Sequence, residues 1–591
     1  LDEAAIEAKG LEPLKPHLDG LAKIADRKAL AKALGESVRA DVDAFNSTNF
    51  ETENLFGLWV AQNLNDPSRY SAFLLQGGLG MPNREYYLDS SQRMADLRKA
   101  YQAHVATVLK LAGIPPGAGS LSGPNGPQGL PESDARAAKV FELERKIAEA
   151  HVSREASEDV TKGNNPIARK DLETKAPGLD WAVFLEAAGL AKEKELILWQ
   201  PTAVTGISAL VSKEPLDVWK DYLAFHAIDR RAEHLPKAFA DERFAFYGKT
   251  LSGTPQQRER WTRSIDSTNL ALGEAVGKLY VERYFPAASK AAVADMVKNI
   301  QAAFGKRIDA LDWMTPGTKA KAKAKLGILK VGVGYPDRWR DYSGLKIVRG
   351  DALGNAERAE KHELLRNLAK LGKPVDRGEW VMTPQTVNAV NLPAMNAMNF
   401  PAAILQPPYF DPNRPAVMNY GAIGAVIGHE ISHSFDDQGA LFDEKGRLAN
   451  WWTKDDFAHF KTSAEKLVKQ YDGYKPFPDL AVNGTLTLSE NIADVAGLAA
   501  AFDAYRMSLG GKPAATVQGL TGDQQFFVAF GQSWRQKRRE ASLRRQVLTD
   551  SHSPSEYRTL TSRNLDAWYE AFDVKPGQAL YLAPKDRVRI W

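Results

Sequence analysis

Apolar residues recur at intervals of three to four positions along much of this chain, the spacing that places them on one face of an α-helix. The pattern predicts helices over residues 21–34, 135–150, 268–284 and 291–311. Alternation of apolar and polar residues, which is typical of strands, is clear only over 327–333 and 380–390. We therefore expect a mainly α protein with a small β component.

The chain is long enough for more than one domain. Its 591 residues exceed the roughly 250–300 at which a single hydrophobic core stops growing, so about two domains are expected. Residues 113–131, rich in Gly and Pro, form either a long surface loop within a helical domain or a linker between domains. Aromatic and Pro-rich motifs concentrate after about residue 380, and we expect the chemistry in that part.

Composition narrows the function classes. A net charge of +4, from 77 basic and 73 acidic residues, gives no reason to expect a nucleic-acid partner. The sequence contains no uninterrupted run of about 18 apolar residues, so we predict no membrane span from it. The chain has no cysteine, so any metal must be held by His, Asp or Glu. One basic run is either a solvated helix face or a positive wall beside a cavity: Lys537, Arg538, Arg539, Arg544 and Arg545.

His429, Glu430 and His433 form a His-Glu-x-x-His pattern. The apolar run before it predicts a helix, with Asn419 as its N-cap. Residues four apart lie on one helix face about 6 Å from each other, so the two imidazoles can bind one zinc ion. Glu430 then lies beside the metal, where a general base for an activated water is needed.

A zinc peptidase needs a third protein ligand, and Glu490 is the candidate. Taken alone, Thr487 and Glu490 read as a helix capping box. Given the histidine pair upstream, we interpret Glu490 as the ligand and Asp494, one helical turn later, as a carboxylate behind a ligand histidine. The helix is expected to continue through residues 495–505.

Asp550, His552 and Arg558 form a polar cluster in a turn-prone segment. A lone histidine is often structural. A histidine flanked by an aspartate and an arginine can instead hold a proton and face a developing oxyanion. The residues alone leave both interpretations open.

Three motifs are specific enough to indicate a family. They cover residues 400–408 (Phe-Pro-Ala-Ala-Ile-Leu-Gln-Pro-Pro), 428–437 and 489–494, with weaker matches at 77–80, 85–88 and 589–591. Over nearly its whole length the chain resembles bacterial members of the neprilysin and endothelin-converting-enzyme family of zinc metallopeptidases. The resemblance implies a thermolysin-like catalytic domain that faces a helical lid domain around a large internal cavity. We assign residues 1–340 to the lid, with parts of the N-terminal and 280–340 stretches packing on the catalytic domain, and residues 341–591 to the catalytic domain.

The resemblance also implies roles for individual residues. His429, His433 and Glu490 match the ligands of one zinc ion per chain, Glu430 the catalytic base, and Asp494 and Asp436 the carboxylates that support the ligands. Asp550 and His552 match a pair that assists the transition state, Arg558 an anchor for the substrate backbone, and Arg589 an arginine near the same contacts. The pocket for the residue after the scissile bond would be formed by Ile404, Tyr409, Ala425, Val426 and Trp534.

The chain departs from the family pattern in two ways. The substrate-aligning strand matches at Asn388 and Ala389, but Val390 and Asn391 replace its two aromatic residues. We expect this to change affinity along the strand and not the chemistry. The family also has a segment that would precede Leu1, so we interpret the chain as a processed or partial form of the protein.

The leading hypothesis is a zinc endopeptidase that cleaves short peptides on the amino side of large hydrophobic residues. The alternatives are a non-catalytic, zinc-containing peptide-binding protein, against which Glu430 argues, and a zinc aminopeptidase, for which no acidic anchor is evident. We expect a monomer that acts outside the cytoplasm, in the periplasm or secreted, with a cytoplasmic location as the alternative.

Overall fold

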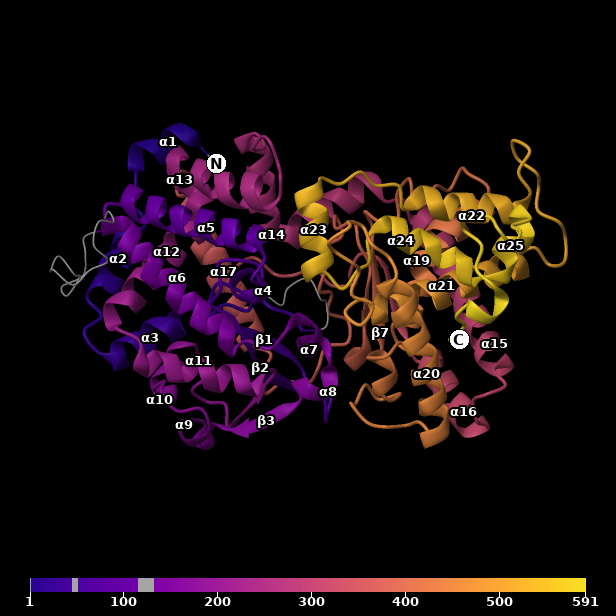
Figure 1. Cartoon of the computed structure of the whole chain (residues 1–591), viewed down its shortest axis with the longest axis horizontal. Coiled ribbons are helices and arrows are strands. Elements are labelled where there is room, and N and C mark those ends of the chain that lie inside the picture. The colour runs from indigo at the N-terminus through magenta and orange to yellow at the C-terminus, as the bar shows by residue number, and fades with distance from the viewer. Residues whose placement is uncertain (1, 45–51, 115–131) are drawn as a thin grey trace.

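The computed structural model describes residues 2–44, 52–114 and 132–591, and the chain forms two lobes that lie side by side (Figure 1). Most of the Gly- and Pro-rich segment 113–131 lies outside the described residues. The mainly α prediction is confirmed. The N-terminal lobe contains helices α1 (Glu3–Lys9), α2 (Lys15–Ala22), α3 (Arg27–Ser37), α4 (Glu85–Leu88), α5 (Gln92–Leu111), α6 (Glu132–Ala150), α7 (Arg154–Glu158), α8 (Val160–Gly163), α9 (Leu172–Lys175), α10 (Trp181–Ala187), α11 (Pro201–Lys213), α12 (Leu216–Arg231), α13 (Lys237–Arg243) and α17 (Ala352–Leu368), with strands β1 (Phe56–Gln62), β2 (Tyr70–Gln76), β3 (Asn165–Ala168) and β4 (Glu195–Leu198).

The C-terminal lobe is reached through the long helix α14 (Arg260–Tyr284), which lies between the lobes in Figure 1. It contains α15 (Ala287–Ala310), α16 (Pro316–Gly327), α18 (Ala416–Asn419), α19 (Ala425–Ser432), α20 (Lys454–Asp472), α21 (Leu488–Ser508), α22 (Gly522–Ser533), α23 (Glu540–Thr549), α24 (Ser555–Thr559) and α25 (Asp566–Phe572), with strands β5 (Lys330–Gly334), β6 (Val390–Leu392) and β7 (Ala397–Pro401).

Each lobe has its own apolar core. Helices α15 and α16 contribute to the C-terminal core, although they precede residue 340. Leu353 and Leu364 of α17 pack into the N-terminal core, although they follow it. We propose that the two cores are two domains and that the chain crosses between them again on either side of α17.

A smaller apolar cluster joins the lobes. Leu64 and Val160 of the N-terminal lobe pack in it with Ala394 and Phe442 of the C-terminal lobe. Leu448 packs against the same cluster, and its amide donates a hydrogen bond of 2.7 Å to the carbonyl of Leu64. Apolar contact and backbone hydrogen bonding thus hold the lobes together on one side of the space between them.

The two sheets are small and have different roles. The N-terminal sheet has the order β1-β2-β4-β3. Its strands contribute residues to the apolar cluster that joins the two lobes. In the C-terminal sheet, of order β5-β7-β6, β5 runs parallel to β7 and β6 pairs with β7 antiparallel. Strand β6 therefore lies at an edge, and Asn388 and Ala389 immediately precede it.

Several predicted elements are confirmed and three are corrected. The helices predicted over 135–150, 268–284 and 291–311 correspond to α6, α14 and α15. The predicted helix over 21–34 is broken between α2 and α3, because Asp26 caps α3 by accepting a hydrogen bond of 2.7 Å from the Ala29 amide. The strand predicted from residue 327 begins only at Lys330, since α16 extends to Gly327.

The strand predicted over 380–390 is wrong except at its last residue, Val390. The preceding residues form turns, in which the Thr386 amide donates to the Thr383 carbonyl and the Pro384 carbonyl accepts from Ala403. Proline has no amide hydrogen to donate to a neighbouring strand. The Pro384 carbonyl accepts from Ala403, which lies outside the strands.

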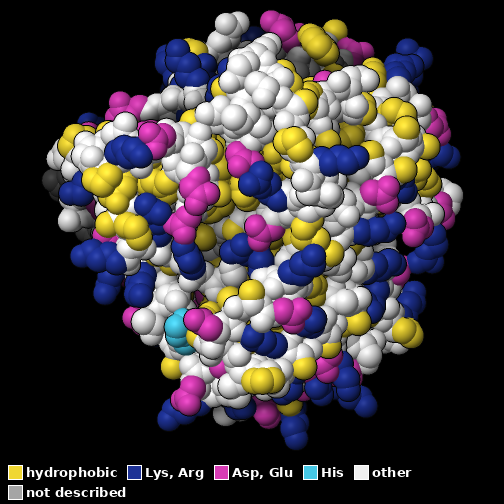
Figure 2. Space-filling model, turned by 90° about the vertical axis from the view of Figure 1, so that its right-hand side faces the viewer, with side chains coloured by type: hydrophobic (Ala, Val, Ile, Leu, Met, Phe, Trp, Pro, Cys, Tyr) yellow, Lys and Arg dark blue, Asp and Glu magenta, His cyan; other side chains and the backbone are white. Residues whose placement is uncertain are grey.

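The surface agrees with the balanced charge. On the face of the C-terminal lobe drawn in Figure 2, basic and acidic side chains are intermingled. Among the described residues, each helix falls short of either the length or the apolar character that a bilayer crossing requires.

Candidate active site

His429 lies on α19 and His433 caps the C-terminal end of that helix, which is continuous with a π-helical segment. Residues Tyr420–Gly424 form this segment between α18 and α19, and π-helical turns are frequent at functional sites. Asn419 is not the N-cap, because α18 begins earlier and is preceded by Pro415. The Asn419 side chain instead donates to the Asp411 carbonyl and accepts from the Asp411 amide, which fastens the preceding loop.

Two glycines allow the ligand-bearing helices to touch at backbone distance. A Cβ atom on Gly428 of α19 would lie 2.2 Å from the Gly497 carbonyl oxygen of α21. One on Gly497 would lie 2.3 Å from the amide nitrogen of His429. Both distances exclude any side chain, so this crossing brings Glu490 opposite the histidines. Sequence reasoning missed this pair, because glycine inside a helix is usually only unfavourable.

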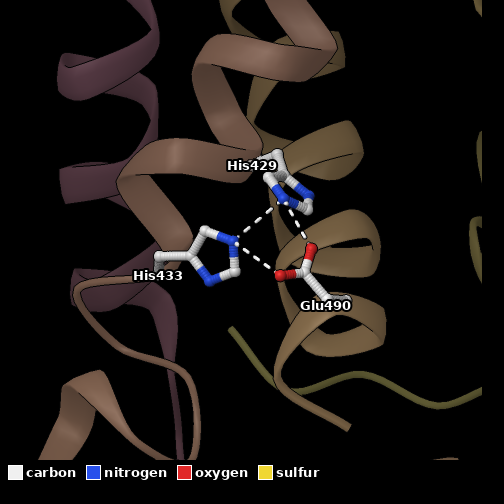
Figure 3. Close-up of side chains that lie close together, drawn as sticks. All are labelled: His429, His433 and Glu490. Atoms are coloured by element: carbon white, nitrogen blue, oxygen red, sulfur yellow. Dashed lines mark hydrogen bonds and ion pairs between the residues drawn. The ribbon is translucent and has the colours of Figure 1, made fainter. Parts of the chain in front are cut away.

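The three predicted zinc ligands converge on one point (Figure 3). His429 Nε2 lies 2.9 Å from His433 Nε2. The carboxylate of Glu490 approaches both, with Oε2 3.1 Å from His429 Nε2 and Oε1 3.6 Å from His433 Nε2. The atoms that would bind a metal all lie within 4.8 Å of one another.

The far side of each imidazole faces a carboxylate. His429 Nδ1 lies 2.8 Å from Asp494 Oδ1, and His433 Nδ1 lies 2.6 Å from Asp436 Oδ2. An ionised carboxylate can only accept, so each Nδ1 carries the proton and each Nε2 lone pair points into the cluster. Outer carboxylates of this kind fix the tautomer of metal-binding histidines.

The cluster fits a divalent cation. The Oε2 atom of Glu490 is buried and accepts no hydrogen bond. Two facing lone pairs beside an unsatisfied carboxylate oxygen are the N and O donors that zinc binds. The capping-box interpretation is wrong, since Thr487 makes no cap and donates instead to the Asn483 carbonyl at 2.9 Å.

Glu430 lies next to this cluster and lines the same cavity. Its side chain is almost fully buried, and burial raises the pKa of its carboxyl above the usual value. Its carbonyl accepts a hydrogen bond of 2.6 Å from Asn391 Nδ2, which ties α19 to β6. A carboxylate with a raised pKa that faces a cavity is suited to accept a proton near neutral pH.

His552 also reaches the cluster. Its Nδ1 and its amide nitrogen both lie within 2.9 Å of Asp550 Oδ1. This leaves Nε2 directed at the cluster, 3.2 Å from Glu490 Oε2. Burial lowers the pKa of His552, but the charges of Glu490 and Asp550 outweigh it, so the net shift is upward.

Arg558 is held more firmly than the sequence suggested. Its Nε and Nη2 atoms each donate at 2.8 Å to one oxygen of Asp494. Its guanidinium also lies 4.0 Å over the ring of Trp534. Burial opposes ionisation of Asp494, but Arg558 outweighs it and lowers the pKa of that carboxyl to about 2. Arg558 therefore braces the carboxylate behind His429 while it lines the cavity.

A cavity of about 460 Å³ contains these groups. The expected pocket residues all line it, namely Ile404, Tyr409, Ala425, Val426 and Trp534, as do Asn388 and Ala389. Arg589 does not: its side chain is 66% exposed and pairs with Asp566. In this structure Arg589 thus lies outside the cavity, and the substrate contact expected of it remains a prediction.

Some lining residues were not found from the sequence. Glu158 and Val160 come from the N-terminal lobe. Glu158 was missed because it lies on the short polar helix α7, whose sequence is like that of any solvated helix. Burial raises the pKa of Glu158 to about 7, and its Oε1 lies 2.9 Å from Arg154 Nε. Of the basic run, Arg538 lines the cavity and donates to Gln546, whereas Arg544 pairs with Asp479 outside it. The run thus contributes both a cavity wall and a solvated face.

Comparison with known proteins gives consistent matches. Two family models described as peptidase family M13 match residues 1–336 and 388–588. Mouse endothelin-converting enzyme-like 1 is 33% identical over 530 residues, which cover 86% of this chain and 65% of that protein. Neutral endopeptidase of Lactobacillus helveticus is 33% identical over 468 residues, which cover 78% of this chain and 70% of that protein.

Two solved structures of Mycobacterium tuberculosis zinc metalloprotease Zmp1 cover the whole of this chain. Its complex with an inhibitor matches with a TM-score of 0.91 at 40% identity and 87% coverage of that chain. Its open state matches with a TM-score of 0.70 at 41% identity and 89% coverage. The lobes of this chain are therefore arranged more like those of the inhibitor complex.

Proposed function

The chain belongs to peptidase family M13, and from that premise we propose that it is a zinc-dependent endopeptidase that hydrolyses short peptides. The observation that carries the proposal is the convergence of His429, His433 and Glu490 on one point, with Glu430 in the same cavity. These three ligands would hold one zinc ion per chain and leave a fourth position open.

Zinc bound there would act as a Lewis acid that polarises the scissile carbonyl and makes a water molecule more acidic. Glu430 accepts the proton of the attacking water on its carboxylate and delivers it to the leaving amine. His552, oriented through Asp550, donates from Nε2 to the carbonyl oxygen as that oxygen becomes negative. Asp494 and Asp436 keep the protons on Nδ1 of the two ligand histidines.

We propose that the substrate lies along the edge strand β6. An edge strand can pair with an extended peptide, and Asn388 at its start lines the cavity. The apolar wall formed by Ile404, Tyr409 and Val426 favours a large hydrophobic residue just after the cut, since burying such a side chain stabilises the complex by roughly 1.5–3 kcal/mol. A cavity of about 460 Å³ between two lobes admits a short peptide and not a folded protein.

The alternatives have less support. A peptide-binding protein needs no buried carboxylate beside its metal, yet Glu430 is there. An aminopeptidase needs a free acidic group for the substrate amine. Among the described lining residues, Glu158 is the one acid from the N-terminal lobe, and it is already paired with Arg154. The monomeric state and the extracytoplasmic location remain predictions.

Metal removal and cleavage mapping test the proposal. Purified protein should contain one zinc ion per chain, lose activity with a chelator and regain it with added zinc. On a mixed peptide library, mass spectrometry should find internal cuts before Phe, Leu or Trp. Cuts confined to the first residue would indicate an aminopeptidase, and binding without any cuts would indicate a peptide-binding protein.

A further inference from the structure

A lysine is fully buried against the loop that follows the helix of the two histidines. Lys325 of α16 is 1% exposed, which is unusual for a side chain that carries a charge. Its Nζ donates to three backbone carbonyls, those of Ser434 at 2.7 Å, Gly439 at 2.7 Å and Phe442 at 2.8 Å. Three acceptors match the three protons of an ammonium group.

The three carbonyls belong to a single loop, residues 434–442, which begins directly after the ligand His433. The loop folds back on that histidine so tightly that a Cβ atom on Gly439 would lie 1.8 Å from the His433 carbonyl oxygen. Lys325 lies inside this turn and joins its three carbonyls at one ammonium group, and the Gly439 carbonyl also accepts from the Phe442 amide at 3.0 Å. Because the ammonium group ties three points of the loop together, the loop conformation depends on it.

The same loop carries the carboxylate that orients His433. Asp436 Oδ1 accepts from the amides of Gln438 at 2.9 Å and Gly439 at 2.6 Å, which leaves Oδ2 facing His433 Nδ1. Asp436 is 3% exposed and cannot turn without breaking these bonds. Its direction therefore follows from the fold of the loop, to which Lys325 contributes three hydrogen bonds.

We propose that Lys325 is a positioning residue for the metal centre, which acts on His433 through the 434–442 loop and Asp436. The proposal rests on the zinc function proposed above. Burial lowers the pKa of Lys325 to about 7, whereas the charges of Asp436, Asp443 and Glu444 favour its ammonium form. Lys325 does not itself line the cavity, and its Nζ bonds to loop carbonyls rather than to a metal ligand, so its effect is indirect, although its partners Gly439 and Phe442 do line the cavity.

The test is zinc affinity, measured by competition with a chromophoric chelator. Lys325→Met removes the charge and keeps the stem, and it should weaken zinc binding by about 10–100-fold, the range for losing an outer contact of a ligand histidine. Asp436→Asn should weaken it to a similar degree. If Lys325 acts through Asp436, the double variant should bind zinc only slightly less tightly than whichever single variant has the lower zinc affinity.

The matched control removes a different buried contact of the same helix. Asp456 accepts hydrogen bonds from Thr315 and Thr318 at the start of α16 and is 1% exposed. Asp456→Asn should lower the melting temperature of the zinc-free protein but leave zinc affinity within about twofold, since the loop is untouched.

Four outcomes overturn the inference. They are unchanged zinc affinity in Lys325→Met, fully additive losses with Asp436→Asn, an equal loss of zinc affinity in Asp456→Asn, and failure to fold of both Lys325→Met and Lys325→Gln. The last would mean that Lys325 serves the fold alone. Wild-type protein that binds no zinc or cleaves no peptide would instead refute the proposed function, so the two failures are distinguishable.

Discussion

At the scale of single residues, the proposed mechanism separates groups that would hold the metal from groups that would act on the substrate. Glu430 and Glu490 are both buried and both line the cavity, yet only Glu490 faces the two imidazoles. A metal ligand and a proton acceptor should fail in different ways when each loses its charge, and the two carboxylates can be compared by the same substitution.

Glu430→Gln should retain zinc and lose about 10²–10⁴-fold in kcat, the usual contribution of a general base. Glu490→Gln should first lose zinc affinity, because a neutral amide is a poor ligand. Zinc content by elemental analysis and kcat on one fluorogenic peptide measure both effects. Normal zinc content and normal turnover in both variants would show that the roles are wrong.

His552 and Arg558 should also differ. His552→Ala should lower kcat by about two to three orders of magnitude with little change in KM, because a donor to the oxyanion acts mainly in the transition state. Arg558→Ala should raise KM, and it should also weaken zinc binding, since Asp494 behind His429 loses both of its guanidinium bonds. Arg558→Lys is the control, because it keeps the charge but not the two parallel bonds. A near-normal kcat in His552→Ala would remove this histidine from the mechanism.

At the scale of secondary structure elements, the crossing of α19 and α21 positions the residues of the proposed metal centre. Gly497→Ala places a methyl group 2.3 Å from the His429 amide and must push the helices apart. We expect a loss of about 1–3 kcal/mol in the free energy of unfolding, as for other overpacked cores, together with weaker zinc binding. Gly305→Ala in α15 is the control, since its methyl group would meet only Leu326 at 3.5 Å and alanine is favoured in a helix. Equal stability of the two variants would contradict the close crossing.

The end of α6 provides a pH-dependent contact in the N-terminal lobe. His151 follows α6 and its Nε2 donates to the Gly77 carbonyl at 2.9 Å, while burial lowers its pKa to about 4. The unfolded chain takes up the proton near pH 6.5 and the folded chain only near pH 4, so stability present above pH 6.5 is lost as the pH falls through this window. At about 1.4 kcal/mol per pH unit, the loss is about 3 kcal/mol.

His151→Gln cannot take up this proton. Between pH 6.5 and 4, urea denaturation should show wild-type protein losing about 3 kcal/mol more than the variant. Parallel curves for the two proteins would mean that His151 is accessible to protons in the folded state.

The elements also show how far the sequence could predict the structure. The helices α6, α14, α15 and α21 follow from apolar spacing, which is a local property. The break at Asp26 and the turns around Pro384 were missed because a cap and a few hydrogen bonds outweighed that spacing. The crossing at Gly497 has no local signal, because it depends on which helix comes to lie opposite.

At the scale of the whole molecule, the chemistry depends on residues far apart in the sequence. The motif around His429 could be found from local spacing together with the family resemblance. The contributions of Lys325, Glu158 and α17 could not, because each depends on contact with a segment about a hundred or more residues away. A single sequence records the residue types but not which of them meet.

Because an apolar cluster lies between the lobes, we expect turnover to depend on how strongly the dissolved salt favours apolar association. We expect the lobes to part at this cluster when a peptide enters the cavity, which would expose Phe442, Leu448 and Leu64 to water. Salting-out anions strengthen apolar association, so sulfate should slow turnover more than chloride at equal ionic strength. Leu64→Ala removes part of the wetted surface and should reduce this difference. An enzyme whose kcat responds equally to both anions would not separate its lobes at this cluster during turnover.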